Sequence, residues 1–189
     1  MLPSSQLMTA AQLSSYRDPS ERRTELLRGR LLVSEPPGYE HGLVLARVSF
    51  ALSLWLRESA SPDATPMGEV VAGDPGFWIA RDPDTVRAPD VAFVAAARRP
   101  AAPVRGFLEA APTLAVEVLS PNDRPGAVLA KVGGWLDAGS ALVWVIDPAA
   151  RVARVYRADG SQAVIDQDGA LEGEEVLPGF RVALAMLVG

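Results

Sequence analysis

The 189-residue chain contains no cysteine. This absence excludes disulfides, thiolate catalysis and the zinc or iron–sulfur sites that depend on cysteine. No apolar run approaches the roughly 18 residues that a membrane-spanning helix requires, and the first residues lack the basic and apolar regions of a signal peptide. We therefore expect a cytoplasmic protein with no membrane partner, because a cysteine-free chain fits a reducing compartment.

Positive charge is also scarce, since 18 lysines and arginines face 23 aspartates and glutamates, for a net charge of −5. This balance argues against a protein that coats nucleic acid through bulk charge, although it allows a local basic patch. Lys131 is the only lysine and His41 the only histidine. A Ser-His-Asp triad would have to use His41, and the chain has no G-x-S-x-G serine elbow.

The order of the expected elements predicts an α/β (α+β) fold. We expect a single domain over residues 1–189, in which residues 1–8 form a flexible tail. Thr9 and Gln12 form a capping box that opens a short helix. A long apolar helix over Glu40–Glu58, which we expect to be buried, lies on one face of a central mixed β-sheet, and a helix over 127–137 lies on the other. The expected strands cover residues 31–33, 69–72, 77–80, 86–94, 114–119, 142–147, 152–156 and 162–165.

Two carboxylates interrupt apolar, strand-like runs. Asp90 lies within residues 88–94 and Glu117 within residues 114–119. The chain between them is long enough for a loop and a second strand beside the first, which would let both side chains converge. A carboxylate in an apolar strand is costly unless it is paired or bound to a cation, and Mg²⁺ or Mn²⁺ prefers such ligands. The alternative is that each acid lies at a strand edge or pairs with an arginine such as Arg87.

Lys131 lies on the helix that leaves the Glu117 strand. In a right-handed crossover the first turns of that helix lie over the end of the strand, where a lysine could steady an attacking hydroxide or a scissile phosphate. The alternative is a solvated helix lysine. Glu25 is a candidate extra ligand or acid partner, with a solvated face as its alternative. His41, near a helix start, is a candidate base or ligand, with a capping or core histidine as its alternative.

Several motifs along the chain form a recognisable set. They are Glu25-Leu26-Leu27-Arg28-Gly29-Arg30-Leu31, Pro36-Pro37 with His41, Arg87-Ala88-Pro89-Asp90-Val91-Ala92-Phe93-Val94, Val116-Glu117-Val118-Leu119-Ser120-Pro121, Lys131, and Trp144-Val145-Ile146-Asp147-Pro148. Together they resemble the bacterial Uma-two family of the PD-(D/E)XK restriction-endonuclease-like superfamily. The resemblance extends roughly from Thr9 to Phe180. It implies a restriction-endonuclease-like core, dependence on Mg²⁺ or Mn²⁺, Asp90 and Glu117 as metal ligands, Lys131 as the catalytic lysine and Glu25 as an accessory acid.

The chain departs from the superfamily pattern at two positions. The lysine of the superfamily normally stands two residues after the glutamate, where this chain has Leu119. Lys131, on the following helix, would take its role. Trp135 stands where the resemblance leads us to expect a tyrosine.

Two main hypotheses for function follow. The first is a metal-dependent endonuclease that hydrolyses DNA phosphodiester bonds. The second is a catalytically silent endonuclease-like fold that serves as a nucleic-acid-binding or oligomeric interaction module. A glycosidase is a third hypothesis, but it would leave Lys131 without a role. A basic rim would favour the nuclease, and its candidate residues are Arg87, Arg98, Arg99, Arg105 and Arg124. A homodimer is also a candidate assembly, with Trp78 and Trp135 as exposed aromatic residues for an interface.

Overall fold

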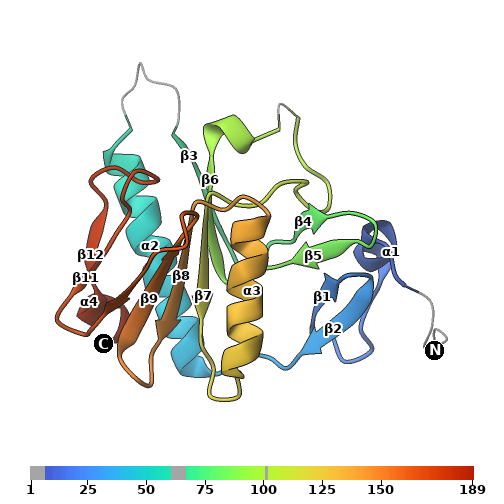
Figure 1. The fold of residues 1–189 in the computed structure, drawn as a ribbon, viewed down its shortest axis with the longest axis horizontal. Helices are drawn as coiled ribbons and strands as arrows, with labels where there is room; N and C mark the ends of the chain where they lie inside the picture. Colours follow the sequence, from blue (N-terminus) through green and yellow to red (C-terminus); the bar gives the residue numbers. More distant parts are fainter. Residues whose placement is uncertain (1–6, 61–66, 101) are drawn as a thin grey trace.

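A six-stranded mixed sheet forms the centre of the molecule (Figure 1). The computed structural model describes residues 7–60, 67–100 and 102–189, so most of the predicted tail and residues 61–66 lie outside it. Strands β7 and β8 are parallel, and every other neighbouring pair in this sheet is antiparallel. In spatial order the strands are β10 (Gln162–Ile165), β9 (Val152–Arg157), β8 (Leu142–Asp147), β7 (Leu114–Val118), β6 (Val91–Ala95) and β3 (Gly68–Ala72).

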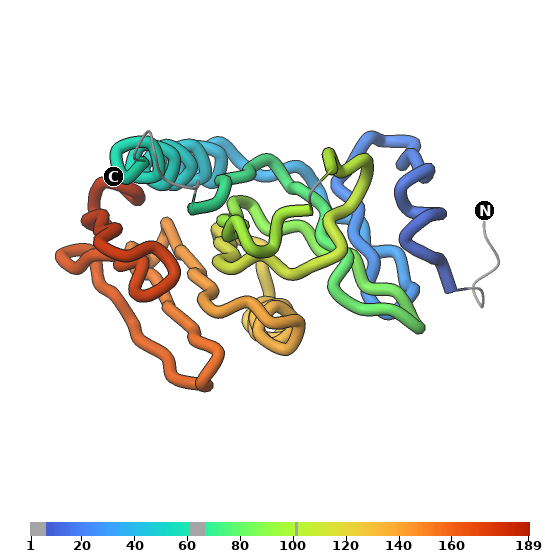
Figure 2. Tube along the Cα trace, turned by 90° about the horizontal axis from the view of Figure 1, so that it is seen from above, coloured from blue at the N-terminus to red at the C-terminus, as the bar shows by residue number. Residues whose placement is uncertain are grey.

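Helices cover both faces of this sheet, as Figure 2 shows from above. Helix α2 (Tyr39–Glu58) packs on one face, and α3 (Pro125–Asp137) packs on the other. Strand β7 alternates between them, because Leu114, Val116 and Val118 join the apolar cluster under α2, whereas Ala115 joins the cluster under α3. The prediction of a mixed sheet flanked by helices on both faces is confirmed.

A second, four-stranded sheet lies at one end of the molecule, in the order β2-β1-β5-β4. Its strands are β1 (Arg23–Leu27), β2 (Arg30–Ser34), β4 (Phe77–Ala80) and β5 (Thr85–Arg87). Arg28 and Gly29 connect β1 to β2 with positive φ angles of 49° and 75°, as a tight hairpin turn requires. Helix α1 (Ala10–Ser15) begins with the predicted Thr9–Gln12 capping box. It packs with buried Met8 against this sheet.

The predicted strand over residues 86–94 is wrong as a single element. The chain leaves the small sheet after Arg87 and enters the central sheet only at Val91. Pro89 lies in the link, and proline cannot donate a hydrogen bond to a strand ladder, which favours a break at this point. Asp90 therefore lies in the segment that connects the two sheets.

Two expectations about burial are also wrong. Helix α2 is buried on one side only, and its outer side exposes Tyr39, Leu43 and Phe50, the last to 67%. In the described part of the chain, no element covers that side of α2 (Figure 2). The number of apolar residues in the helix does not reveal this exposure. Trp135 was expected to be exposed, yet it is 0% exposed and meets the ring of Phe77 edge-on at 6.0 Å between centroids.

The C-terminal segment closes the α2 side of the central sheet. It contains β11 (Ala170–Glu172), β12 (Arg181–Ala183) and α4 (Leu184–Val188). Leu171, Leu177 and Phe180 are buried there, and Phe180 stacks on Trp144 at 5.7 Å between ring centroids. Within the described ranges, no helix is both long enough and apolar enough to cross a membrane.

Candidate active site

The two strand acids meet at one end of the central sheet. Strands β6 and β7 are antiparallel neighbours, with Val91 opposite Val116, so the residue before β6 lies beside the end of β7. Asp90 accepts a hydrogen bond at Oδ2 from the Val118 amide at 2.6 Å. Asp90 is 2% exposed and Glu117 is 7% exposed. The sequence-based expectation that neighbouring strands bring the two acids to one place agrees with this geometry.

Helix α3 supplies both partners of Glu117. The Lys131 ammonium lies 2.7 Å from Oε2, and the Trp135 indole donates to Oε1 at 2.8 Å. The parallel pairing of β7 with β8 requires a crossover, and α3 is that crossover, which places its inner side over Glu117. Trp135 was not predicted as a site residue. Its spacing of four residues after Lys131 is a usable signal, since such residues share one helix face.

Glu25 enters the site from the small sheet. Its Oε2 accepts from Arg87 at 2.9 Å, and its Oε1 accepts from the Ala88 amide at 2.7 Å. The Lys131 ammonium lies 3.4 Å from the same Oε1. Glu25 is buried, so the alternative of a solvated face does not hold. The carboxylate thereby connects the small sheet to α3.

His41 and Arg23 complete the cluster around Asp90. His41, in the first turn of α2, places Nε2 3.3 Å from Asp90 Oδ2, while its buried Nδ1 has no hydrogen-bond partner among the described residues. Arg23, at the start of β1, places Nη1 3.2 Å from Asp90 Oδ1 and 3.0 Å from Asp74 Oδ1. Its Nη2 donates to the Ala88 carbonyl. Arg23 was missed in the sequence, where its position two before Glu25 on the same strand face was the available signal.

The surroundings of the acids shift their pKa values in opposite directions. Burial raises the pKa of Glu117 to about 7, with Asp90 adding to the rise and Lys131 opposing it. Burial would also raise the pKa of Asp90, but hydrogen bonds from His41 and the Val118 amide hold it below its ordinary value. Burial likewise opposes ionisation of Glu25, yet Lys131, Arg87 and Arg23 lower its pKa. The hydrogen bond to Asp90 raises the pKa of His41. At neutral pH, Asp90 and Glu25 are therefore ionised, while Glu117 is near its midpoint.

The donor chemistry of the site fits a divalent ion. Asp90 and Glu117 offer the carboxylate oxygens that Mg²⁺ and Mn²⁺ prefer. Across the described ranges, no three His, Asp or Glu side chains are grouped to hold a metal. Mg²⁺ often binds through one or two carboxylates, with water and substrate phosphate as its other ligands. The raised pKa of Glu117 shows that this acid favours an added positive charge. The two acids thus fit as a partial ligand set.

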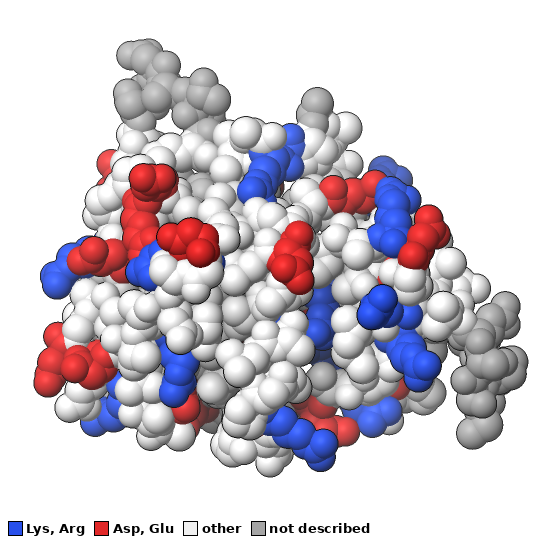
Figure 3. Space-filling view, viewed as in Figure 1, with Lys and Arg blue, Asp and Glu red and all other residues white. Residues whose placement is uncertain are grey.

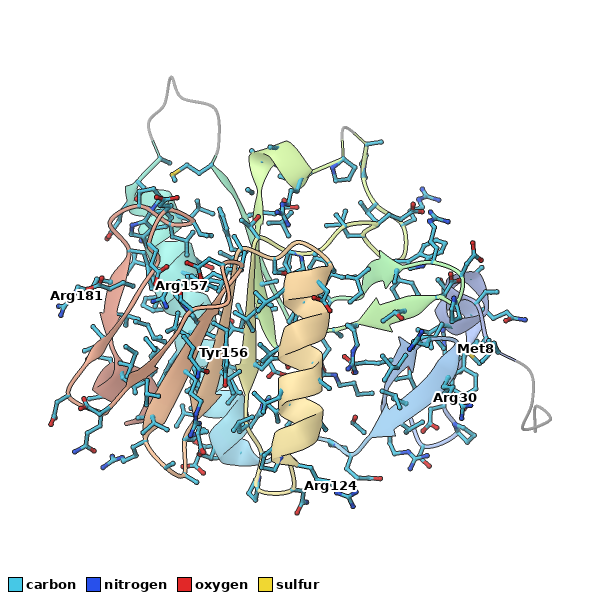
Figure 4. The ribbon with its side chains drawn as sticks, viewed as in Figure 1. Met8, Arg30, Arg124, Tyr156, Arg157 and Arg181 are labelled. Atoms are coloured by element: carbon cyan, nitrogen blue, oxygen red, sulfur yellow. The ribbon has the colours of Figure 1, made fainter. Side chains whose placement is uncertain are left out.

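The arginines considered for a basic rim do not form one group around the site, since two of them, Arg98 and Arg99, lie away from it. Arg87 is buried against Glu25. Arg98 donates to the carbonyls of Ala111 and Gly139, and Arg99 pairs with Glu69, both at the far end of β6. Arg124 lies at the exposed start of α3, as Figure 4 shows. On the face drawn in Figure 3, basic side chains lie among acidic ones. The described surface there lacks a continuous basic area.

Comparison with known proteins, solved structures and family models shows what the chain is similar to. No curated protein matches it. A solved structure from Anabaena variabilis, described as "a putative nuclease", superposes with a TM-score of 0.80 over 96% of this chain and 97% of that one. The sequence identity is 17%, so this likeness concerns the fold. The Uma2 family model, described as "Putative restriction endonuclease", matches residues 10–186. The chain therefore belongs to the Uma2 family, the family that its motifs resemble.

Proposed function

We propose that the protein is a metal-dependent endonuclease that hydrolyses DNA phosphodiester bonds. The observation that carries this proposal is the convergence of Asp90, Glu117 and Lys131 at one end of the sheet, where the Lys131 ammonium lies 2.7 Å from Glu117. A carboxylate pair with an adjacent ammonium suits phosphoryl transfer, which depends on charge neutralisation and positioning. Membership of a family described in terms of restriction endonucleases supports the same reaction class.

Each residue has a role in this proposal. Asp90 and Glu117 would hold Mg²⁺ or Mn²⁺, which when bound would add positive charge at the phosphate and lower the pKa of water. Lys131 is held by Glu117 and by the Ala88 carbonyl at 2.9 Å. Its ammonium can stabilise the charge that develops on phosphoryl oxygens. Glu25 is a positioning residue, because it orients Lys131, and His41 keeps Asp90 ionised.

The test combines metal binding with cleavage. Mn²⁺ is titrated calorimetrically into the wild type and into Asp90→Asn, and supercoiled and linear DNA are then incubated with Mg²⁺ or Mn²⁺. We expect metal binding and cleavage by the wild type, loss of both in Asp90→Asn, and loss of cleavage with retained binding in Lys131→Met. The matched control Glu109→Gln alters an exposed pair with Arg81 and should behave like the wild type. Equal cleavage by wild type and Lys131→Met would contradict the proposal.

The silent interaction module remains the second candidate. It is favoured because protein groups already occupy the oxygens of both acids. Asp90 contacts Arg23 and His41, and Glu117 contacts Lys131 and Trp135. It is also favoured by the net charge of −5. This candidate predicts DNA binding or self-association without cleavage under any of the metal conditions above.

For the predicted homodimer, we propose the outer side of α2 as the interface, in place of Trp78 and Trp135. In an antiparallel pair of outer α2 sides, exposed Ala46 would face Phe50 of a second copy, and exposed Tyr39 would face Arg57. This self-complementarity fits a two-fold interface, in which one patch meets itself. Light scattering after gel filtration should give a dimeric mass for the wild type and a monomeric mass for Phe50→Glu. Leu129→Glu, at an exposed position on α3, is the control that keeps the dimer, and a monomeric wild type would refute it.

A further inference from the structure

The side chain of Arg23 bridges the two sheets. Its backbone belongs to β1 of the small sheet, and its guanidinium reaches Asp90 at the edge of the central sheet. The same Nη1 lies 3.0 Å from Asp74, and Nη2 lies 3.7 Å from Glu25. One guanidinium thus touches three of the four carboxylates that belong to the cluster, the fourth being Glu117.

This contact changes the charge that a metal ion would meet. Asp90 offers Oδ1 to Arg23 and Oδ2 to His41 and the Val118 amide, so both of its oxygens are engaged. A divalent ion bound at Asp90 would lie close to a guanidinium of the same sign. Like charges repel at this range, and burial weakens solvent screening. Entry of the ion therefore requires Arg23 to withdraw from Asp90.

Arg23 has a feature that suits it to a second position. Its buried Nε has no hydrogen-bond partner in the described part of the chain, and its side chain is 20% exposed. A guanidinium binds phosphate through two parallel N–H groups, which requires donors in this fork geometry. A phosphodiester oxygen at the site would satisfy the unpaired Nε, which the carboxylates around Arg23 leave without an acceptor.

We infer that Arg23 is a built-in counter-cation, which keeps the affinity of Asp90 for the divalent ion low until a substrate phosphodiester draws the guanidinium away. The inference rests on the proposed function, since it assigns a role within the same site. It makes metal binding and phosphodiester binding mutually supportive, because each ligand relieves the obstacle to the other. The free protein then binds metal weakly, and substrate completes the site.

The experiment measures Mn²⁺ affinity by calorimetry, without cleavage as a readout. We compare the wild type, Arg23→Gln and Arg22→Gln, each with and without dimethyl phosphate as a phosphodiester that does not turn over. Arg22 is the matched control, because its partners are Asp18 and Glu35, outside the site. We expect Arg23→Gln to bind Mn²⁺ at least about tenfold more tightly than the wild type, and Arg22→Gln to match the wild type. Dimethyl phosphate should tighten Mn²⁺ binding by the wild type but not by Arg23→Gln.

The outcomes separate this inference from the proposed function. Equal Mn²⁺ affinity in wild type and Arg23→Gln, lost in Asp90→Asn, would overturn the role of Arg23 while the metal site stands. No Mn²⁺ binding by wild type or Arg23→Gln at millimolar concentrations, with or without dimethyl phosphate, would overturn the metal site and the inference together. Circular dichroism establishes that each variant is folded. If Arg23→Gln unfolds, Arg23→Met serves instead, because methionine removes the positive charge while it keeps an unbranched side chain, and unchanged affinity in that variant refutes the inference.

Discussion

Replacement of Glu117 with glutamine is expected to make the stability of the protein less dependent on pH. The pKa of this buried carboxyl lies at about 7 in the folded protein, against an ordinary value of 4.5. The folded state therefore holds the Glu117 proton more tightly than the unfolded state. Its contribution to stability is fully present below pH 4.5 and is lost as the pH rises to about 7.

The size of this effect follows from the two pKa values. Each pKa unit corresponds to about 1.4 kcal/mol, so Glu117 alone removes about 3 kcal/mol of stability over the whole window. Most of that loss falls between pH 5 and pH 8. Glutamine does not titrate, and its carbonyl can still accept the hydrogen bond from Trp135. Other groups that titrate, such as His41, are common to both proteins and largely cancel in the comparison.

Urea unfolding at pH 5 and pH 8, with chelator present to keep metal out, measures this difference directly. We expect the wild type to lose about 2 to 3 kcal/mol more than Glu117→Gln between these two pH values. Glu109→Gln, whose side chain is 60% exposed, is expected to retain the pH dependence of the wild type. An identical change in unfolding free energy for wild type and Glu117→Gln would show that Glu117 does not titrate in this window.

Three further substitutions test other parts of the structure by urea or thermal unfolding. Glu25→Gln leaves the buried charge of Arg87 without its partner and should lower the free energy of unfolding by about 3 to 5 kcal/mol. Glu69→Gln, in an exposed pair, should lower it by less than about 1 kcal/mol. Equal losses in the two variants would contradict the argument from burial. Trp135→Phe removes a hydrogen bond to a carboxylate and should cost about 1.5 to 3 kcal/mol, and NMR titration should show a still higher pKa for Glu117, since that bond lowers it. Thr9→Ala removes a helix cap and should cost about 1 kcal/mol, and an unchanged unfolding midpoint would rule out that contribution.

Local chemistry made the helices predictable. The capping box at Thr9 marks the start of α1, and Gly139, with a φ of +100°, follows the end of α3, where glycine commonly ends a helix. Side-chain pattern alone did not separate β5 from β6, because Pro89 is the one residue between them that disfavours a continuous strand. The exposure of Phe50 was also beyond the sequence, since burial depends on which elements fold back over a helix.

The candidate site was predictable in its core and not in its surroundings. Asp90 directly precedes an apolar strand, Glu117 stands within the neighbouring one, and Lys131 follows on the next helix, so the meeting of Glu117 and Lys131 depends on one strand–helix crossover. Arg23 reaches the site only because the small sheet docks beside the central sheet. No periodicity in the chain records that docking, which brings together residues more than 60 positions apart, as in the Arg23–Asp90 hydrogen bond.

The charged cluster also constrains how the sequence can change over evolutionary time. Arg87 and Glu25 belong to the small sheet, Asp90 joins the two sheets, and Arg23 spans them. A neutral replacement of one member would leave a partner with an uncompensated buried charge. We therefore expect these positions to change in pairs, Glu25 with Arg87 and Asp90 with Arg23. Relatives without catalytic activity would also retain these pairs for as long as the two sheets must stay together.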